Sequence, residues 1–220
     1  MSLKAVGLDL SLTGTGVSVI DKTDANFDIA SWQGLPGHHD KRGDRSDILV
    51  RYECIKTSPG DFVHFYKRIK YILDEILKFV DLNQKPDLCV IESVFVGGFN
   101  KNVGLELSKL GAVVRFQLSE LEIPFVDVVA AQPKKFCTGN AQKGEKAMMM
   151  LSVYKNWGMS VENNNSCDAF VMSNVALAIL EHGKELKQNK KACRDVLTNP
   201  QAEVVCKVIE NTPYASSLNF

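Results

Sequence analysis

Three carboxylic acids in this sequence stand where a buried element begins or ends. Asp9 lies near the end of the apolar run 3–10, Glu92 near the end of the run 88–93, and Asp168 in the first turn of an apolar segment over 163–180. An acid at such a place costs several kcal/mol unless it is paired, hydrogen-bonded or bound to a metal. Adjacent central strands would bring Asp9 and Glu92 to one edge of a sheet, which favours a metal site.

The segment around Asp9 allows two other interpretations. The turn that follows it, 11–16, is rich in small Gly, Ser and Thr residues and leads into a second apolar run. Asp9 could cap that turn at the end of a strand. Alternatively, the small residues could let backbone amides approach a phosphate group.

Asn165 and Asp168 are three residues apart at the start of the helix predicted over 163–180, so both side chains can point to one place. An N-cap role suits Asn165 or Ser166, and Asp168 could merely favour the helix dipole. A shared role as metal ligands is the alternative.

Basic and aromatic side chains near these acids could contact nucleic acid. The basic ones lie in a Gly-rich loop, 34–46, and in the segment 134–146, which could equally be a solvated loop and helix start. The aromatic ones lie in the segment 94–101 and could stack on an unpaired base or simply pack. The candidates are Arg42, Arg45, Phe95, Phe99, Lys134, Lys135, Lys143 and Lys146.

Hydrophobic periodicity predicts the elements that position these residues. Strands are predicted over 3–10, 17–20, 27–32, 48–55, 88–93 and 125–129, and helices over 61–81, 103–121, 144–157 and 163–180. The first strands are joined by connections too short for crossovers and are therefore antiparallel, whereas 88–93 follows a helix and is therefore parallel. Beyond residue 184 the pattern predicts weak helices over 190–197 and 201–209 and a loose end after 212.

The composition limits the possible classes of protein. The 220 residues suit one domain, and the formal net charge of +0 means that a nucleic-acid ligand must be met by local clusters of charge. The six cysteines are dispersed without a Cys-x-x-Cys pair, which disfavours a zinc cage and indicates a reducing compartment. No signal-peptide or membrane-span pattern is evident, so we expect a cytoplasmic protein with no membrane partner.

The order of these motifs resembles that of the RuvC-type Holliday junction resolvases, over about residues 6–180. The resemblance implies a ribonuclease H-like α/β fold over 1–184, with a mixed five-stranded sheet and helices on both faces, and a helical extension or tail over 185–220. The inserted loop and polar tail suggest a phage or viral member, acting in the host cytoplasm or nucleoid. The matching patterns are Gly7-Leu8-Asp9, Val90-Ile91-Glu92, Gly111-Ala112-Val113, the run 132–139 with Lys146, and Asp168-Ala169.

The resemblance also implies an activity: magnesium-dependent endonuclease cleavage that resolves four-way or other branched DNA by paired cuts. Two Mg²⁺ ions per active site, roughly 3.5–4 Å apart, would activate water and stabilise the leaving oxygen, and Mn²⁺ would substitute. Asp9 would bridge the ions, Glu92 would bind one and Asp168 the other. Lys146, or alternatively Lys143, would contact the scissile phosphate.

The near two-fold symmetry of a four-way junction implies a homodimer. The helix 103–121 is the candidate interface, because its apolar residues are too numerous for one narrow stripe.

One position departs from the family pattern. Asn165 stands where the family usually has a further acid, and an asparagine can ligate a metal through its carbonyl oxygen but brings no charge. Either the natural enzyme functions with Asn165, or this chain carries an Asp-to-Asn change that blocks cleavage. Two other classes remain open: a catalytically inert junction-binding protein, and an actin-like or sugar-kinase-like ATPase, which would need a duplicated domain that 220 residues hardly supply.

Overall fold

A computed structural model describes residues 2–23, 48–94, 101–141, 146–191, 193 and 195–212. The predicted strand 27–32, the loop 34–46 and the end after 212 lie outside the described residues. Among the helices of the described residues, none combines the length and the apolar character that crossing a membrane requires.

Five strands form one mixed sheet in the order β3-β2-β1-β4-β5. The antiparallel part consists of β3, β2 and β1, and the parallel part of β1, β4 and β5. This confirms the predicted α/β class with a mixed five-stranded sheet. The strands are β1 (Leu3–Asp9), β2 (Gly14–Lys22), β3 (Ile48–Lys56), β4 (Leu88–Glu92) and β5 (Phe125–Val128).

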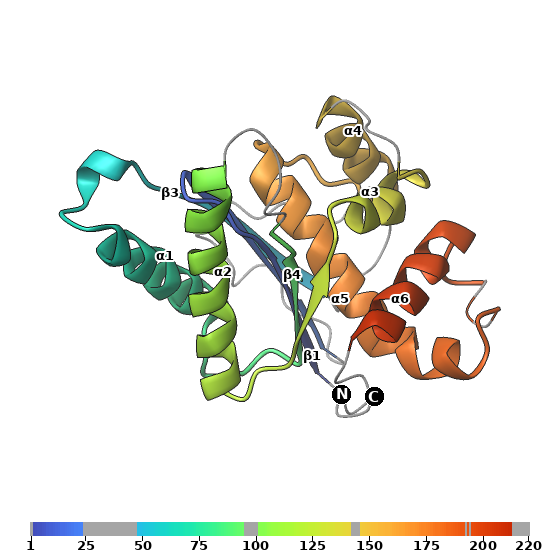
Figure 1. Cartoon of the computed structure of the whole chain (residues 1–220). Helices are drawn as coiled ribbons and strands as arrows, with labels where there is room; N and C mark the ends of the chain where they lie inside the picture. The colour runs from blue at the N-terminus through green and yellow to red at the C-terminus, as the bar shows by residue number, and fades with distance from the viewer. Residues whose placement is uncertain are drawn as a thin grey trace, which may run out of the picture.

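Helices cover both faces of the sheet (Figure 1). One face carries α1 (Phe65–Val80) and α2 (Lys101–Glu120). The other carries α3 (Ala131–Thr138), α4 (Lys146–Trp157), α5 (Asn164–Gln188) and α6 (Asn199–Asn211). Each face has its own hydrophobic cluster, because strand residues alternate between the two sides of the sheet.

Helix α5 lies directly on the backbone of β1 and β2 because two glycines leave room for it. A Cβ atom at Gly7 would stand 2.0 Å from the carbonyl oxygen of Ala169, and one at Gly16 would stand 2.0 Å from that of Asn165. Both contacts are with helix backbone, which cannot rotate away. The start of α5, which carries Asn165 and Asp168, is therefore fixed over the strand ends.

Gly7→Ala is expected to lower the free energy of unfolding by at least about 3 kcal/mol, the upper end of the usual cost of overpacking. The added methyl group must push α5 off the sheet. Urea denaturation followed by circular dichroism measures the change. Gly60→Ala is the matched control, because a Cβ there meets nothing within 4 Å and should change stability by less than about 0.5 kcal/mol. Equal midpoints for the two variants would contradict this account of the packing.

The structure corrects several predicted boundaries. Helix α1 begins at Phe65 rather than at residue 61, because Pro59–Asp61 forms a separate 3-10 turn closed by a hydrogen bond from Ser58 N to Asp61 Oδ2 (3.1 Å). Helix α3 was not predicted. Helix α5 continues to Gln188, and the described part of 190–197 is a turn, not a helix.

Helix α6 belongs to the same packed body as the strands and α5. Its buried residues join the hydrophobic cluster of the α5 face, and Lys135 on α3 forms an ion pair with Glu203 on α6 (2.6 Å). Helix α5 itself runs across residue 184, the predicted boundary of the nuclease domain. Whether 185–220 acts as an accessory extension stays a prediction.

Candidate active site

The structure brings Asp9 and Glu92 to one edge of the sheet, on one face. Leu8 pairs with Ile91 in the parallel ladder of β1 and β4, so the next residues, Asp9 and Glu92, end neighbouring strands. Leu8 and Ile91 belong to the cluster under α1 and α2. Strand alternation therefore directs Asp9 and Glu92 toward the opposite face, where α5 begins.

A cavity of about 420 Å³ opens at this edge, and both acids line it. The other walls come from the residues that follow β1, β4 and β5, from the first residue of α3 and from Leu107 on α2. Of the predicted ligands that the structure describes, Asn165 and Asp168 do not line this cavity. The cavity can therefore receive a polar ligand against two carboxylates at the carboxyl ends of parallel strands.

Asp168 and Lys134 lie close enough to Glu92 to influence its carboxyl group electrostatically. Burial raises the pKa of the Glu92 carboxyl, the negative charge of Asp168 raises it further, and the positive charge of Lys134 opposes the shift. Two acids and one lysine thus lie close enough to influence each other. A divalent cation would relieve the repulsion between the carboxylates, so the arrangement fits such an ion.

Glu92→Gln is expected to stabilise the metal-free protein at neutral pH. Because the pKa of Glu92 is higher in the folded state than in the unfolded chain, its contribution to stability is greatest below the unfolded value. That contribution is lost as the pH rises through the folded value. The uncharged glutamine removes this loss of stability at neutral pH. Each kcal/mol added to the free energy of unfolding raises the Tm by roughly 2–4 °C for a chain of this length.

Thermal unfolding in EDTA across a pH series measures the effect of Glu92→Gln. Glu106→Gln, at an exposed position on α2, is the control and should leave the Tm unchanged. A lower Tm for Glu92→Gln than for the parent at neutral pH would mean that the charged form of Glu92 is stabilised in the folded protein.

The start of α5 differs from the predicted capping. The N-cap is Asn163, whose side chain accepts a hydrogen bond from Ser166 N (2.9 Å), and not Asn165 or Ser166. Asn165 instead donates from Nδ2 to the carbonyl oxygen of Gly14 on β2 (2.6 Å). Its Oδ1 is the atom that could ligate a metal, and its amide ties α5 to the sheet.

Two thiols near Asp168 remain protonated. Burial raises the pKa of Cys167 to about 12, and the negative charge of Asp168 adds to the shift. Burial, then Cys167 and Asp168, raises the pKa of Cys137 to about 12. The ionisable donors at this edge are therefore carboxylates, a set that suits Mg²⁺ or Mn²⁺ rather than a thiolate-binding metal.

The predicted basic and aromatic residues divide into described and undescribed ones. Lys134 lies on α3 near Glu92, whereas Lys135 on the same helix is paired with Glu203. Lys146 is the first residue of α4, but its side chain is outside what the structure describes. The remaining candidates lie outside the described residues: Arg42, Arg45, Phe95, Phe99 and Lys143.

A buried arginine on α1, which was not predicted as a site residue, fixes the turn that follows Asp9. Arg68 is 5% exposed. It donates from Nε to Thr57 Oγ1 (2.9 Å) and from Nη2 to the carbonyl oxygen of Leu12. The signal was present, because Arg68 is three residues after Phe65 and stands in the apolar stripe of its helix. It connects α1 to the residue that follows β3 and to the turn between β1 and β2.

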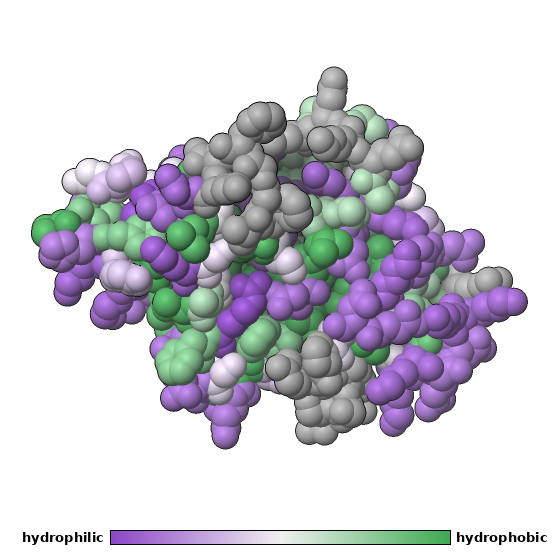
Figure 2. All heavy atoms as spheres, in the orientation of Figure 1, coloured by the Kyte–Doolittle hydropathy of each residue, from purple (hydrophilic) through white to green (hydrophobic). Residues whose placement is uncertain are grey.

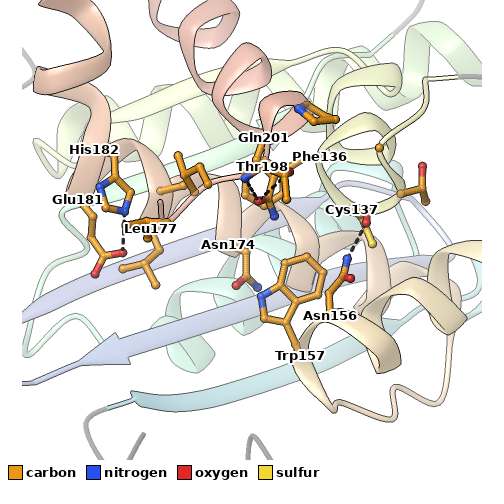
Figure 3. Close-up of a pocket in the computed structure, with 16 residues that line it drawn as sticks. Phe136, Cys137, Asn156, Trp157, Asn174, Leu177, Glu181, His182, Thr198 and Gln201 are labelled. Atoms are coloured by element: carbon orange, nitrogen blue, oxygen red, sulfur yellow. Dashed lines mark hydrogen bonds and ion pairs between the residues drawn. The ribbon is translucent and has the colours of Figure 1, made fainter. Parts of the chain in front are cut away.

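A larger cavity of about 630 Å³ lies elsewhere, among α3, α4, α5 and α6 (Figure 3). Figure 3 shows Trp157 and Asn156 at one end and Glu181 with His182 at the other. None of the described acids of the candidate active site lines it.

This sheet order, with acids gathered at the edge where a long helix begins, defines a ribonuclease H-like resolvase fold. The family model "Crossover junction endodeoxyribonuclease RuvC" matches residues 40–181, more than half of the chain, and the chain belongs to this family. The matched range includes Glu92, Asn165 and Asp168 but begins after Asp9, which only the structure places beside Glu92.

Solved structures of resolvases share the fold. RuvC of Thermus thermophilus in complex with a Holliday junction substrate is 17% identical, with a TM-score of 0.60, covering 81% of this chain and 96% of that one. Another structure of Thermus thermophilus RuvC is 16% identical, with a TM-score of 0.56, covering 83% of this chain and 96% of that one.

The yeast mitochondrial Holliday junction resolvase Ydc2 is 11% identical, with a TM-score of 0.50, covering 87% of this chain and 83% of that one. No curated protein sequence matches the chain. The family match supports a junction-resolving nuclease and does not favour the ATPase alternative.

Proposed function

We propose that this protein resolves four-way DNA junctions by metal-dependent, paired phosphodiester cleavage. The observation that carries the proposal is that Asp9 and Glu92 line one cavity, with Asp168 close enough to raise the pKa of Glu92, in a chain of the RuvC family. Other branched DNA, such as flaps, belongs to the same substrate class.

The proposed metal ligands are oxygen atoms. We assign Asp9 to bridge two Mg²⁺ ions, Glu92 to bind one, and Asp168 with Asn165 Oδ1 to complete the other; Mn²⁺ would substitute. All four residues end a strand or begin α5, so the folded backbone holds them in place before substrate binds. Bound divalent ions supply an activated water and stabilise the leaving oxygen.

The protein's own residues bind and orient the DNA. Lys134, beside Glu92, is placed to neutralise a phosphate near the acids. We assign Lys146, with Lys143 as the competing choice, to the scissile phosphate. Further proposed DNA contacts are Lys135, once it leaves Glu203, and Arg42, Arg45, Phe95 and Phe99.

Paired cleavage requires two active sites, so we propose a homodimer. Helix α2 buries Leu110, Val114 and Leu118 against α1 and the sheet. Three of its other apolar side chains are at least half exposed: Val103, Leu105 and Phe116. Figure 2 shows hydrophobic side chains among hydrophilic ones over α2. An apolar surface of this kind suits a second copy of the chain.

Cleavage of a synthetic four-way junction by the full chain tests the proposal, with linear duplex and flap DNA alongside. With Mg²⁺ or Mn²⁺ we expect paired nicks in strands of like polarity, and no nicks in EDTA. If the protein binds the junction but does not cut it with either metal, it is a catalytically inert junction-binding protein, as the uncharged Asn165 would permit. ATP hydrolysis without DNA cleavage would indicate the ATPase class.

A further inference from the structure

Three side chains of different chemistry converge where α5 ends. His182 and Glu185 are three residues apart on α5, and Cys193 lies in the turn that follows the helix. One ligand atom of each lies within 4.8 Å of the other two. The Cys193 thiol donates a hydrogen bond to Glu185 Oε2 (2.9 Å).

The backbone of the turn holds the thiol in this position. Cys193 has a φ of 62°, in the left-handed region that a residue with a side chain rarely adopts. Its carbonyl oxygen accepts hydrogen bonds from Val196 N (3.1 Å) and Leu197 N (2.8 Å). At the start of the turn, Asn189 N donates to the Glu185 carbonyl oxygen (2.8 Å). The turn thus returns to the helix end and points its sulfur at Glu185.

We propose that His182, Glu185 and Cys193 bind one zinc ion. Imidazole, carboxylate and thiolate are the ligands that Zn²⁺ takes in proteins, with a fourth position left for water. Mg²⁺ avoids sulfur, so this site differs in metal from the acids at the sheet edge. On binding, the Cys193 thiol releases to solvent the proton that it now donates to Glu185.

The neighbours of His182 fit a ligating histidine. Glu181 Oε2 lies 3.8 Å from His182 Nε2, and a carboxylate beside a ligating imidazole orients the ring. Glu181 is itself held by Lys22 on β2. Figure 3 shows Glu181 and His182 together at one end of the cavity among α3, α4, α5 and α6.

The site would fasten α5 to the turn that leads into α6. Helix α6 packs on α5 and reaches α3 through the Lys135–Glu203 ion pair. His182 lines this cavity and none of the described acids of the candidate active site does, so the zinc would lie away from those acids and join α5 to the turn that follows it. The sequence does not predict this site, because its ligands come from one helix end and one turn and do not follow a known zinc-binding spacing.

Titration with Co²⁺ tests the proposal, because a cobalt–thiolate bond gives a charge-transfer band that oxygen ligands do not. The parent is the full chain with Asp9→Asn, which weakens metal binding at the sheet edge. We expect the band to saturate at one Co²⁺ per chain and to vanish when one equivalent of Zn²⁺ is added. His182→Ala and Cys193→Ser should each weaken cobalt binding by at least about 100-fold, more than the loss of an indirect partner.

His64→Ala is the matched control, because His64 is exposed before α1, and it should leave the titration unchanged. Circular dichroism checks that each variant is folded. If Cys193→Ser does not fold, the result for His182→Ala decides the test. The absence of a thiolate band in the parent, or its persistence in folded Cys193→Ser or folded His182→Ala, would overturn the proposal.

Discussion

Asp9→Asn is expected to lower the rate of four-way junction cleavage by at least about 100-fold while the protein stays folded. Asparagine has the same shape as aspartate but lacks its charge, so the strand end and its packing are retained. Loss of a partner that merely orients a metal ligand costs about 10–100-fold, and loss of the ligand itself should cost more. Asp9 lines the cavity beside Glu92, where we propose that its charge helps to hold the metal ions.

Single-turnover cleavage at a series of Mg²⁺ concentrations measures the effect of Asp9→Asn. Binding of the uncut junction in EDTA should remain or become tighter, because a negative charge has been removed near the DNA phosphates. Asp74→Asn, at an exposed position on α1, is the control and should cleave like the parent. If Asp9→Asn also cleaves like the parent, Asp9 caps the turn and is not a metal ligand.

The sheet and its acids could be predicted from sequence because both leave local signals. The apolar runs around Leu8 and Ile91 end at charged residues, and the connections fix which strands are antiparallel. The neighbouring positions of Asp9 and Glu92 then follow from the parallel pairing of their strands. The candidate site is thus largely a consequence of strand order.

Helix α3 was missed although its ends carry ordinary signals. Pro133 stands in its first turn, where a proline is tolerated, and Gly139 takes the left-handed backbone (φ 80°) that ends many helices. The basic pair between them suggested a solvated loop. Its eight residues are too few for a clear helical period.

The orientation of Asn165 could not be predicted, because its partner is distant in sequence. The Gly14 carbonyl oxygen that its amide contacts is 151 residues away, and the contact depends on how closely α5 approaches β2. That approach depends on Gly16, whose missing Cβ makes room for the Asn165 backbone. Sequence spacing alone pairs Asn165 with Asp168 and says nothing of the sheet.

Asn165→Asp is expected to raise the rate of junction cleavage by roughly tenfold or more at limiting Mg²⁺, because ion affinity rises with the number of charged ligands. The same change should lower the stability of the metal-free protein. Asn165 Nδ2 donates to Gly14 O at 2.6 Å, and a carboxylate there would face a carbonyl oxygen. Losing that hydrogen bond at a partly buried position costs about 1–3 kcal/mol. Cleavage and thermal unfolding, each with and without Mg²⁺, measure the two effects.

Asn163→Asp separates the role of position 165 from a general effect of charge. It adds the same negative charge at the same helix end, and an aspartate caps α5 as well as the asparagine that now accepts from Ser166 N. It should change neither cleavage nor stability appreciably. A gain in cleavage confined to Asn165→Asp means that the asparagine limits the enzyme by leaving the second ion one charge short. Equal cleavage by Asn165→Asp and the parent means that the natural enzyme works with an amide, whose contact with Gly14 holds α5 over the acids.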